Sequence, residues 1–302
     1  MNDLETIEVL IIGGSYAGLA AAMTLGRSLR RVLVVDAGKP CNRQTPHSHN
    51  FLTRDGETPA AIAALGKEQV LHYPTVSWLD DTVTGIVKQE QGFEATTAGG
   101  KKVIARKLLF ATGITDHMPE LDGFAACWGI SVLHCPYCHG YEVSHKRLAI
   151  RGNGDMGFHL AMLIQHWSKD LRIFTDGTPE FSAEQLDKLK EHQIEVVPGA
   201  LAALEHKDGY MSAVRLQDGS TYAQDALFAR IPFSQHCTIP EALGCEHDEL
   251  GYLFSNEMKQ TTVAGIYAAG DCTTMMRSVA SAVAAGAMAG SALNKEMIDE
   301  DF

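Results

Sequence analysis

The sequence IEVLIIGGSYAG at residues 7–18 passes from an apolar run directly into a glycine-rich turn. The residues that follow, 19–28, have the composition of a helix, and the next apolar run, RVLVVD at 31–36, ends in Asp36. A buried strand, a glycine turn, a helix and a second buried strand make a βαβ unit. The chain is therefore predicted to begin with a Rossmann-like fold.

The turn has the pattern of a dinucleotide-binding loop. In a G-x-G-x-x-G loop the backbone approaches a pyrophosphate, which binds at the N-terminus of the following helix. Here the loop runs from Gly13 to Gly18 through Ser15, Tyr16 and Ala17, and Ser15 replaces the middle glycine. Asp36 lies 23 residues after the first glycine (36 − 13 = 23), where a ribose-binding carboxylate belongs. The alternative is a tight strand–helix turn without a ligand.

The same pattern begins again after residue 146. A strand is predicted at 147–151, a complete G-x-G-x-x-G loop with Gly152, Gly154 and Gly157 follows, and then a helix at 158–167 and a strand at 171–175. Two βαβ units so far apart indicate two nucleotide-binding folds.

The second loop lacks a feature of NADPH sites. Such sites normally hold the 2′-phosphate with arginines after the second strand, but here Asp176 follows. Two missing charge-assisted hydrogen bonds of about 1.5–3 kcal/mol each would weaken NADPH binding ~10²- to 10⁴-fold. Asp176 would repel the phosphate or bind the 2′-hydroxyl of NADH. The loop therefore takes NADH, takes another ligand, or is vestigial.

The remaining elements are predicted from periodicity and capping residues. Thr58 and Pro59 open a helix at 60–71, and the capping box that begins at Ser182 opens a helix at 183–192. Short strands at 82–87, 93–97 and 102–104 are expected to form a small antiparallel sheet. Further strands are predicted at 107–111, 194–197, 213–216, 226–231 and 266–269, and a long helix at 278–293.

Between the two loops lies HCPYCHG at residues 134–140. This string fits a redox dithiol, a c-type haem attachment site, or half of a zinc site. Haem attachment needs an export route and an axial ligand. A zinc site needs two further ligands, and His134 and His139 are too close in sequence to the cysteines to complete a tetrahedron easily. With a nucleotide fold on each side, a redox dithiol is predicted and no metal is expected.

The chemistry of such a dithiol depends on its thiolate. A thiol with a pKa of ~8.5 is only about 3% ionised at pH 7. A flanking histidine can stabilise the thiolate or carry its proton. Cys135, Cys138 and His139 are therefore the predicted catalytic residues. The alternative for His139 is a surface histidine without a role.

Composition excludes several classes of function. The chain has 302 residues and a net charge of −12, and no Lys/Arg cluster, so neither nucleic acid nor an anionic membrane is an expected partner. A membrane span and a secretory signal are not found, which predicts a cytoplasmic protein. The other cysteines are scattered and are predicted to be small buried hydrophobes: Cys41, Cys127, Cys237, Cys245 and Cys272.

The order of these parts resembles the low-molecular-weight thioredoxin reductases over nearly the whole chain. After the first loop come an ATG turn at 111–113, the C-x-x-C, the second loop, and YAAGD at 267–271. The resemblance implies FAD at the first loop and an FAD-binding role for Asp271. The residues it assigns to FAD are Gly13, Ser15, Tyr16, Ala17, Gly18, Asp36, Ala111, Thr112, Gly113, Gly270, Asp271, Arg277, Ser278 and Val279.

The resemblance also implies the domain organisation. The fold class is α/β, with two Rossmann-like, three-layer ββα domains, the second inserted into the first. The FAD domain would comprise residues 1–114 and 237–302, and a domain of NAD(P)-binding type with the C-x-x-C would comprise 115–236. Cys138 would face the flavin and Cys135 would attack the substrate. The family implies a homodimer and a thioredoxin-like protein or a small dithiol or disulfide as substrate.

Two departures from the family pattern point to an atypical branch. The HRRxxxR element of NADPH-dependent members is absent, and His139 replaces the acid after the second cysteine. CPYCHGYE at 135–142 is similar to a branch that includes oxidases forming disulfides in natural products such as gliotoxin and holomycin. A flavin-dependent dithiol oxidase with O₂ as acceptor is therefore the alternative function. A non-enzymatic haem- or metal-binding protein is the alternative from another class. The histidines of the loop 41–50 are either flavin neighbours or part of a polar loop.

Overall fold

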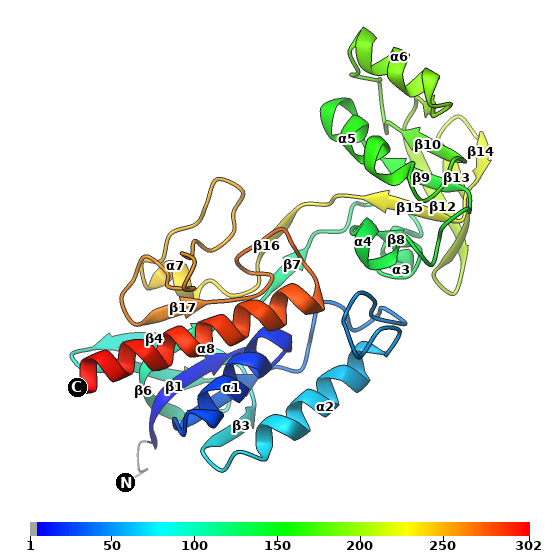
Figure 1. Cartoon of the computed structure of the whole chain (residues 1–302). Helices are drawn as coiled ribbons and strands as arrows, with labels where there is room; N and C mark the ends of the chain where they lie inside the picture. The colour runs from blue at the N-terminus through cyan, green and yellow to red at the C-terminus, as the bar shows by residue number, and fades with distance from the viewer. Residues whose placement is uncertain (1–4) are drawn as a thin grey trace. The chain divides into compact units, whose positions relative to one another are not determined.

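The computed structural model describes residues 5–302, so the acidic start of the chain, residues 1–4, lies outside the described residues. The chain forms two compact units (Figure 1). The outer unit contains the residues up to Arg43 together with Phe51–Thr115 and Phe233–Phe302. The inserted unit contains Asp116–Pro232 and the short segment Gln44–Asn50, which we call the 44–50 strap.

The outer unit is built on one mixed sheet in the order β3-β2-β1-β6-β5-β4, with β17 also paired to β6. Its strands are β1 (Glu5–Ile12), β2 (Val32–Asp36), β3 (Val76–Asp80), β4 (Val83–Gln89), β5 (Gly92–Thr97), β6 (Lys102–Phe110) and β17 (Ile266–Ala268). Its helices are α1 (Tyr16–Arg27), α2 (Pro59–Leu71), α7 (Ile239–Ala242) and α8 (Val279–Asp301).

The helices α1, α2 and α8 cover one face of this sheet (Figure 1). The apolar core beneath them joins strand residues such as Val9 and Val34 to Ala21 of α1 and Leu293 of α8. A second core on the opposite face joins Leu10 and Phe110 to the segment after α7. The sheet is therefore buried on both faces, as the apolar runs of β1 and β2 require.

The strand β6 corrects the expectation of a separate small antiparallel sheet. Residues 102–104 and 107–111 were expected as two strands, but Lys102–Phe110 is one strand. Its first half pairs with the antiparallel hairpin β4–β5, and its last three residues pair with β17. Its burial alternates at first and becomes continuous at the centre of the sheet, so the change of pattern resembled a break.

The inserted unit has three layers. A parallel sheet in the order β11-β10-β9-β15-β8 packs against an antiparallel sheet, β12-β13-β14, through one core, and against α5 and α6 through another. Its strands are β8 (Val132–Leu133), β9 (Leu148–Arg151), β10 (Leu171–Phe174), β11 (Glu195–Val197), β12 (Leu201–Lys207), β13 (Tyr210–Leu216), β14 (Thr221–Ala223) and β15 (Ala226–Ala229). Its helices are α3 (Phe124–Cys127), α4 (Pro136–His139), α5 (Gly154–Ile164) and α6 (Ala183–Glu191). The predicted α/β class is confirmed.

Two short strands, β7 (Ile114–Asp116) and β16 (Phe233–Gln235), pair where the chain passes between the units. The backbone N–H of His117 donates to the carbonyl of Pro232 at 2.8 Å, next to this pair. Thr115 and His236 contact each other through Oγ1 and Nδ1 at 2.9 Å. The two passages of the chain are thereby tied together.

Two helix starts were predicted from their capping residues. Thr58 caps α2, and Ser182 and Gln185 form the capping box of α6. The start of α5 was predicted wrongly, at 158 instead of Gly154, because the last residues of the glycine loop are already helical. The predicted end of α8 at 293 was also wrong, since the helix continues to Asp301. Over residues 5–302, no helix has the length and apolar character needed to cross a membrane.

Candidate active site

The segments assigned to FAD gather at one edge of the outer sheet. β1 is parallel to β2 and β6, and β17 is parallel to β6. These strands end at Ile12, Asp36, Phe110 and Ala268. Parallel strands end at a common edge, and ligands of open α/β sheets bind outside this edge. The structure thus brings three segments together there: Gly13–Gly18, Ala111–Gly113 and Gly270–Asp271.

The first glycine loop needs its glycines for close contact. Gly13 has φ +101°, and a Cβ there would lie 2.3 Å from the carbonyl oxygen of Ala111. A Cβ on Gly18 would lie 2.0 Å from the carbonyl oxygen of Gly13. The loop is therefore packed tightly against the ATG turn and the start of α1.

Asp36 fixes the loop from the next strand. Its Oδ1 accepts a hydrogen bond from the N–H of Gly14 at 2.8 Å, and its Oδ2 accepts one from Gly38 at 3.1 Å. Trp78, which the sequence reasoning missed, packs on this corner, because a Cβ on Gly14 would meet its ring at 2.1 Å. The sequence analysis did not predict β3, the strand that carries Trp78. In the structure β3 pairs with β2, and Trp78 lies opposite Val34, two residues before Asp36.

The start of α1 suits an anion. The residue before the helix, Ser15, makes no side-chain cap to it within residues 5–302, and the first turn carries no acidic residue. A helix N-terminus of this kind offers backbone N–H groups and a positive dipole to a phosphate. The close backbone approach, the Asp36 carboxylate and this helix end fit the pyrophosphate and ribose of a dinucleotide such as FAD.

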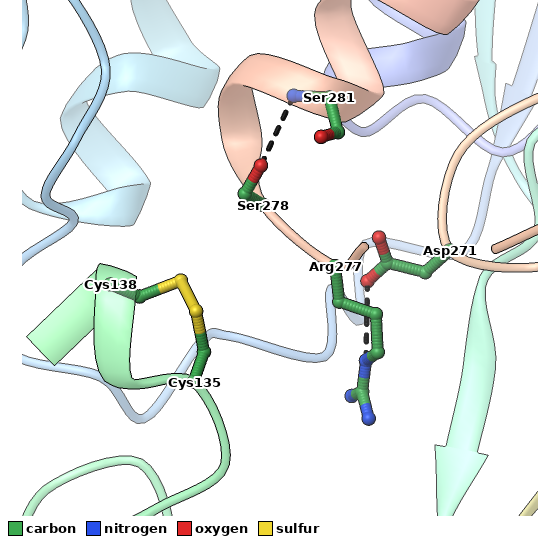
Figure 2. Close-up of a disulfide and its surroundings, with 6 residues drawn as sticks. All are labelled: Cys135, Cys138, Asp271, Arg277, Ser278 and Ser281. Atoms are coloured by element: carbon green, nitrogen blue, oxygen red, sulfur yellow. Dashed lines mark hydrogen bonds and ion pairs between the residues drawn. A yellow bond between two sulfur atoms is a disulfide. The ribbon is translucent and has the colours of Figure 1, made fainter. Parts of the chain in front are cut away.

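Asp271 lies in a polar cluster of the outer unit. Its Oδ2 is 3.8 Å from Nε of Arg277 (Figure 2). The same oxygen accepts a hydrogen bond from the thiol of Cys41 at 3.5 Å. Cys41 was expected to be a buried hydrophobe, but it is only partly buried and has this polar contact. Cys237 is also only partly buried, whereas Cys127, Cys245 and Cys272 are buried as expected. Burial raises the pKa of Cys272 to about 12, so this thiol is protonated.

The other two residues of the RSV segment belong to the start of α8. The hydroxyl of Ser278 accepts a hydrogen bond from the N–H of Ser281 at 3.1 Å and caps the helix (Figure 2). Val279 is the first helical residue and is buried in the core under α1 and α8. These two residues therefore have clear structural roles, and a direct role in FAD binding stays a prediction.

Cys135 and Cys138 are joined in a disulfide in the inserted unit (Figure 2). Cys135 precedes the single turn α4, and its carbonyl accepts hydrogen bonds from the N–H groups of Cys138 and His139, both at 3.2 Å. Gly140 ends the turn against the indole of Trp167, which a Cβ would meet at 2.8 Å. Tyr137, between the cysteines, is exposed and meets the same indole edge-on. The ring of two cysteines is thus held on a packed turn.

His139 lies near two other ionisable groups, His49 of the loop 41–50 and Glu142. Its ring and that of His49 are 6.1 Å apart and perpendicular. Nδ1 of His49 lies 3.4 Å from Oε1 of Glu142. Burial lowers the pKa of His139, the neighbouring His49 lowers it further, and Glu142 opposes both. His139 is therefore predominantly neutral at pH 7 and able to accept a proton.

The histidines of the loop 41–50, His47 and His49, lie in the 44–50 strap. It belongs to the inserted unit although the residues on both sides of it belong to the outer one. Gln44 and Thr45 pack at Gly129, and His47 and His49 have rings 6.3 Å apart. His134 instead lies against Trp128, at 6.0 Å between the rings. No sequence signal connects the strap to Glu142, because the pairing spans more than ninety residues.

The second glycine loop is occupied by the protein's own side chains. Asn153 caps α5 by accepting a hydrogen bond from the N–H of Gly154 at 2.9 Å. The same side chain accepts from the N–H of Glu180 at 2.8 Å and donates to the carbonyl of Thr178 at 2.8 Å. Asp155, in the first turn of α5, accepts from the Gln185 amide at 2.7 Å. The segment after β10 is thereby held across the loop.

Asp176 is likewise engaged. Arg151, at the end of β9, donates to its Oδ2 from Nε at 3.0 Å and from Nη2 at 2.7 Å. Its Oδ1 accepts from the N–H of Leu201 at 2.9 Å. A ribose hydroxyl would compete with these contacts. Gly152 and Gly157 do approach closely, since a Cβ on Gly157 would meet the backbone of Gly152 at 2.8 Å.

Metal ligands do not converge anywhere in residues 5–302, where no three His, Cys, Asp or Glu side chains form a candidate site.

Comparisons with known proteins agree with this geometry. The family model for pyridine nucleotide-disulphide oxidoreductase matches residues 7–289. The thioredoxin reductase aclD of Aspergillus oryzae is 32% identical over 294 residues, covering 93% of each chain. A putative thioredoxin reductase TrxB from Bacillus anthracis has a TM-score of 0.93 at 33% identity, over 98% of this chain and all of that one (100%). An oxidoreductase from Agrobacterium tumefaciens has a TM-score of 0.91 at 37% identity, over 97% and 99%.

The match covers both glycine loops and the disulfide between them. It confirms the predicted family and the predicted enzyme class. The chain belongs to the pyridine nucleotide-disulphide oxidoreductase family, as a flavin-dependent enzyme of the thioredoxin reductase type.

Proposed function

We propose that the outer unit binds FAD at the carboxyl edge of its sheet and that electrons pass between FAD and the Cys135–Cys138 pair, and from there to an external disulfide. The support is the first loop, where Gly13, Asp36 and the start of α1 fit a dinucleotide. When bound, FAD supplies the two-electron chemistry that interconverts the dithiol and the disulfide. Asp271 and Arg277 are the proposed neighbours of its ribityl chain.

The cysteines exchange disulfides in two balanced steps. In the reductive direction the thiolate of Cys135 attacks a substrate disulfide, forms a mixed disulfide, and releases one substrate thiolate. The thiolate of Cys138 then attacks Cys135, restores the Cys135–Cys138 bond and releases the second substrate thiolate. The substrate gains two electrons and two protons, and the enzyme dithiol loses them. The same steps run in reverse with a substrate dithiol.

His139 is the proposed acid–base group. It follows Cys138 directly, and its half-buried ring has a lowered pKa, so that it is neutral and can accept the proton of a thiol. In the reverse step the imidazolium returns that proton to the leaving sulfur.

The contacts of the second loop favour a second candidate function, dithiol oxidation with O₂ as acceptor. The hydrogen bonds of Asn153 and the acidic first turn of α5 stand where a pyrophosphate would bind, and Arg151 is already paired with Asp176. A dinucleotide would have to displace these contacts and approach Asp155. In this second function the substrate dithiol, and not NADPH, supplies the two electrons that pass through the Cys135–Cys138 pair and the flavin to O₂. Similarity to the atypical branch is consistent with this direction.

An anaerobic titration of the holoenzyme tests both proposals. We expect a dithiol such as dithiothreitol to bleach the flavin absorbance, and stoichiometric NADPH or NADH to leave it unchanged on the same timescale. Rapid bleaching by NADPH would contradict the proposed role of the second loop. In air, one H₂O₂ formed for each dithiol oxidised would support the oxidase, whereas no oxygen uptake would exclude it. A purified protein without flavin absorbance would refute FAD binding altogether.

The proposed partner is a thioredoxin-like protein or a small dithiol or disulfide, in keeping with the names of the relatives. We also propose a homodimer in the cytoplasm. Five cysteines outside the active pair form no disulfide within residues 5–302, which suits a reducing compartment.

A further inference from the structure

The 44–50 strap contributes an ionisable side chain to the dithiol turn. His49 belongs to the inserted unit, although Arg43 and Phe51, on either side of the strap, belong to the outer unit. The rings of His49 and His139 are perpendicular, and their centroids are 6.1 Å apart. His49 is mostly buried, with 20% of its side chain exposed. A buried histidine held against a second histidine beside a redox disulfide is a functional candidate.

Glu142 supplies a carboxylate to this histidine pair. It follows α4 by three residues, and its Oε1 lies 3.4 Å from Nδ1 of His49. Glu142 is closer to solvent than His49, with 36% of its side chain exposed. A carboxylate at one ring nitrogen selects the tautomer and the orientation of a histidine.

We propose that His49 and Glu142 are positioning residues for His139, so that Glu142, His49 and His139 form a proton relay from solvent to the Cys135–Cys138 dithiol. This inference rests on the proposed acid–base role of His139. In the relay, a proton leaves the Cys138 thiol for the imidazole of His139 when the thiolate forms. It returns along the same groups when the sulfur is released.

The electrostatic environment of His139 gives the relay a testable sign. The ionisable groups that face it are His49 from the strap and Glu142 from the turn after α4, while the two cysteines of its own turn are joined. Besides burial, His49 lowers the pKa of His139 and Glu142 raises it. Removing one or the other should therefore move the titration of His139 in opposite directions, which a purely structural role would not do.

The test follows the Cε1–H NMR signal of His139 in the disulfide form of the holoenzyme across pH, assigned by its loss in His139→Asn. We expect His49→Asn to shift the titration upward and Glu142→Gln to shift it downward, with the double variant near the wild type. Glu142→Asp keeps the negative charge, so the His139 titration of this variant should stay close to that of the wild type. His166→Asn and Glu184→Gln, exposed changes in the same unit, serve as controls and should not move it.

The rate of dithiol exchange is the second measurement. His139→Asn should slow it by about 10²-fold or more, and His49→Asn or Glu142→Gln on the order of 10-fold, with a displaced pH profile. Titrations that stay unchanged, or shift with the same sign in both variants, would overturn the relay. If the wild type bound no flavin or exchanged no dithiol, the proposed function would fail, while the NMR titration would still show separately whether His49 and Glu142 act on His139.

Discussion

The side-chain oxygen of Asn153 accepts a hydrogen bond from the backbone N–H of Glu180 at 2.8 Å, so the second glycine loop is bound by its own chain. The N-cap residue of α1 in the first loop, Ser15, makes no side-chain cap in residues 5–302. The same βαβ fold thus occurs twice. Among the described residues, the N-terminus of its helix has no side-chain cap in the first copy and is capped by a side chain in the second. This contrast supports the proposal that the dinucleotide binds at the first loop.

The two capping positions predict different costs of mutation. Asn153→Ala removes a helix cap and two further hydrogen bonds, and should lower the free energy of unfolding by about 1–2 kcal/mol. Ser15→Ala should change that of the FAD-free protein by less than ~0.5 kcal/mol. Urea unfolding of both variants measures this difference. Equal losses at the two positions would contradict the contrast between the loops.

Gly13 should be indispensable for FAD binding. Gly13→Ala places a Cβ 2.3 Å from the Ala111 carbonyl at φ +101°, and should cost about 2–4 kcal/mol of stability and yield a colourless protein. Gly100 is the matched control, because it has φ +82° but no atom within 4 Å of its Cβ position. Gly100→Ala should cost about 1 kcal/mol from backbone strain and keep the flavin. Flavin absorbance per protein gives the answer, and a yellow Gly13→Ala protein would refute the site.

Cys138 should be needed for turnover and not for the cofactor. Cys138→Ser removes the redox disulfide but leaves the outer unit intact, so we expect normal flavin content and no bleaching by dithiols. Cys237→Ala, which changes a partly buried thiol of the outer unit, should retain turnover. Undiminished disulfide turnover in Cys138→Ser would exclude the proposed exchange.

The end of α8 should make stability depend on acid pH. Lys107 is buried, and it binds Glu296 at 2.7 Å and also Glu300. Burial raises the pKa of Glu300, but the hydrogen bonds of Lys107 and Arg106 outweigh burial and hold it below its usual value. Its carboxylate therefore stabilises the fold above the unfolded-state pKa of ~4.3, and this contribution is lost as the pH falls through the folded value.

Lys107→Met checks this pH dependence. Because Glu300 is partly exposed, we expect a loss of only about 1–2 kcal/mol at pH 7. The difference from the wild type should shrink as the pH falls below ~4. Thermal unfolding at pH 7 and pH 3.5 measures it, and a difference independent of pH would argue against the ion pairs.

The predictable parts of the molecule are those encoded locally. The apolar run before Gly13, the caps at Thr58 and Ser182, and the spacing of Cys135 and Cys138 each act within a few residues, and the fold class follows from them. The contacts of His49 with Glu142 and of Trp78 with Gly14 bring distant parts of the chain together. The continuity of β6 depends on having two different neighbours along its length. Such features arise from tertiary packing, which periodicity does not report.

The pairing of β6 with β17 has a consequence for the order in which the protein can be completed during synthesis. The outer unit needs β17 in its sheet and α8 against α1, yet both are synthesised only after the inserted unit. Residues 116–232 emerge earlier as one uninterrupted run that contains all strands of both inserted sheets. Since domains generally fold as units during translation, the disulfide-bearing unit can assemble first. The outer unit is complete only once β17 and α8 have been made.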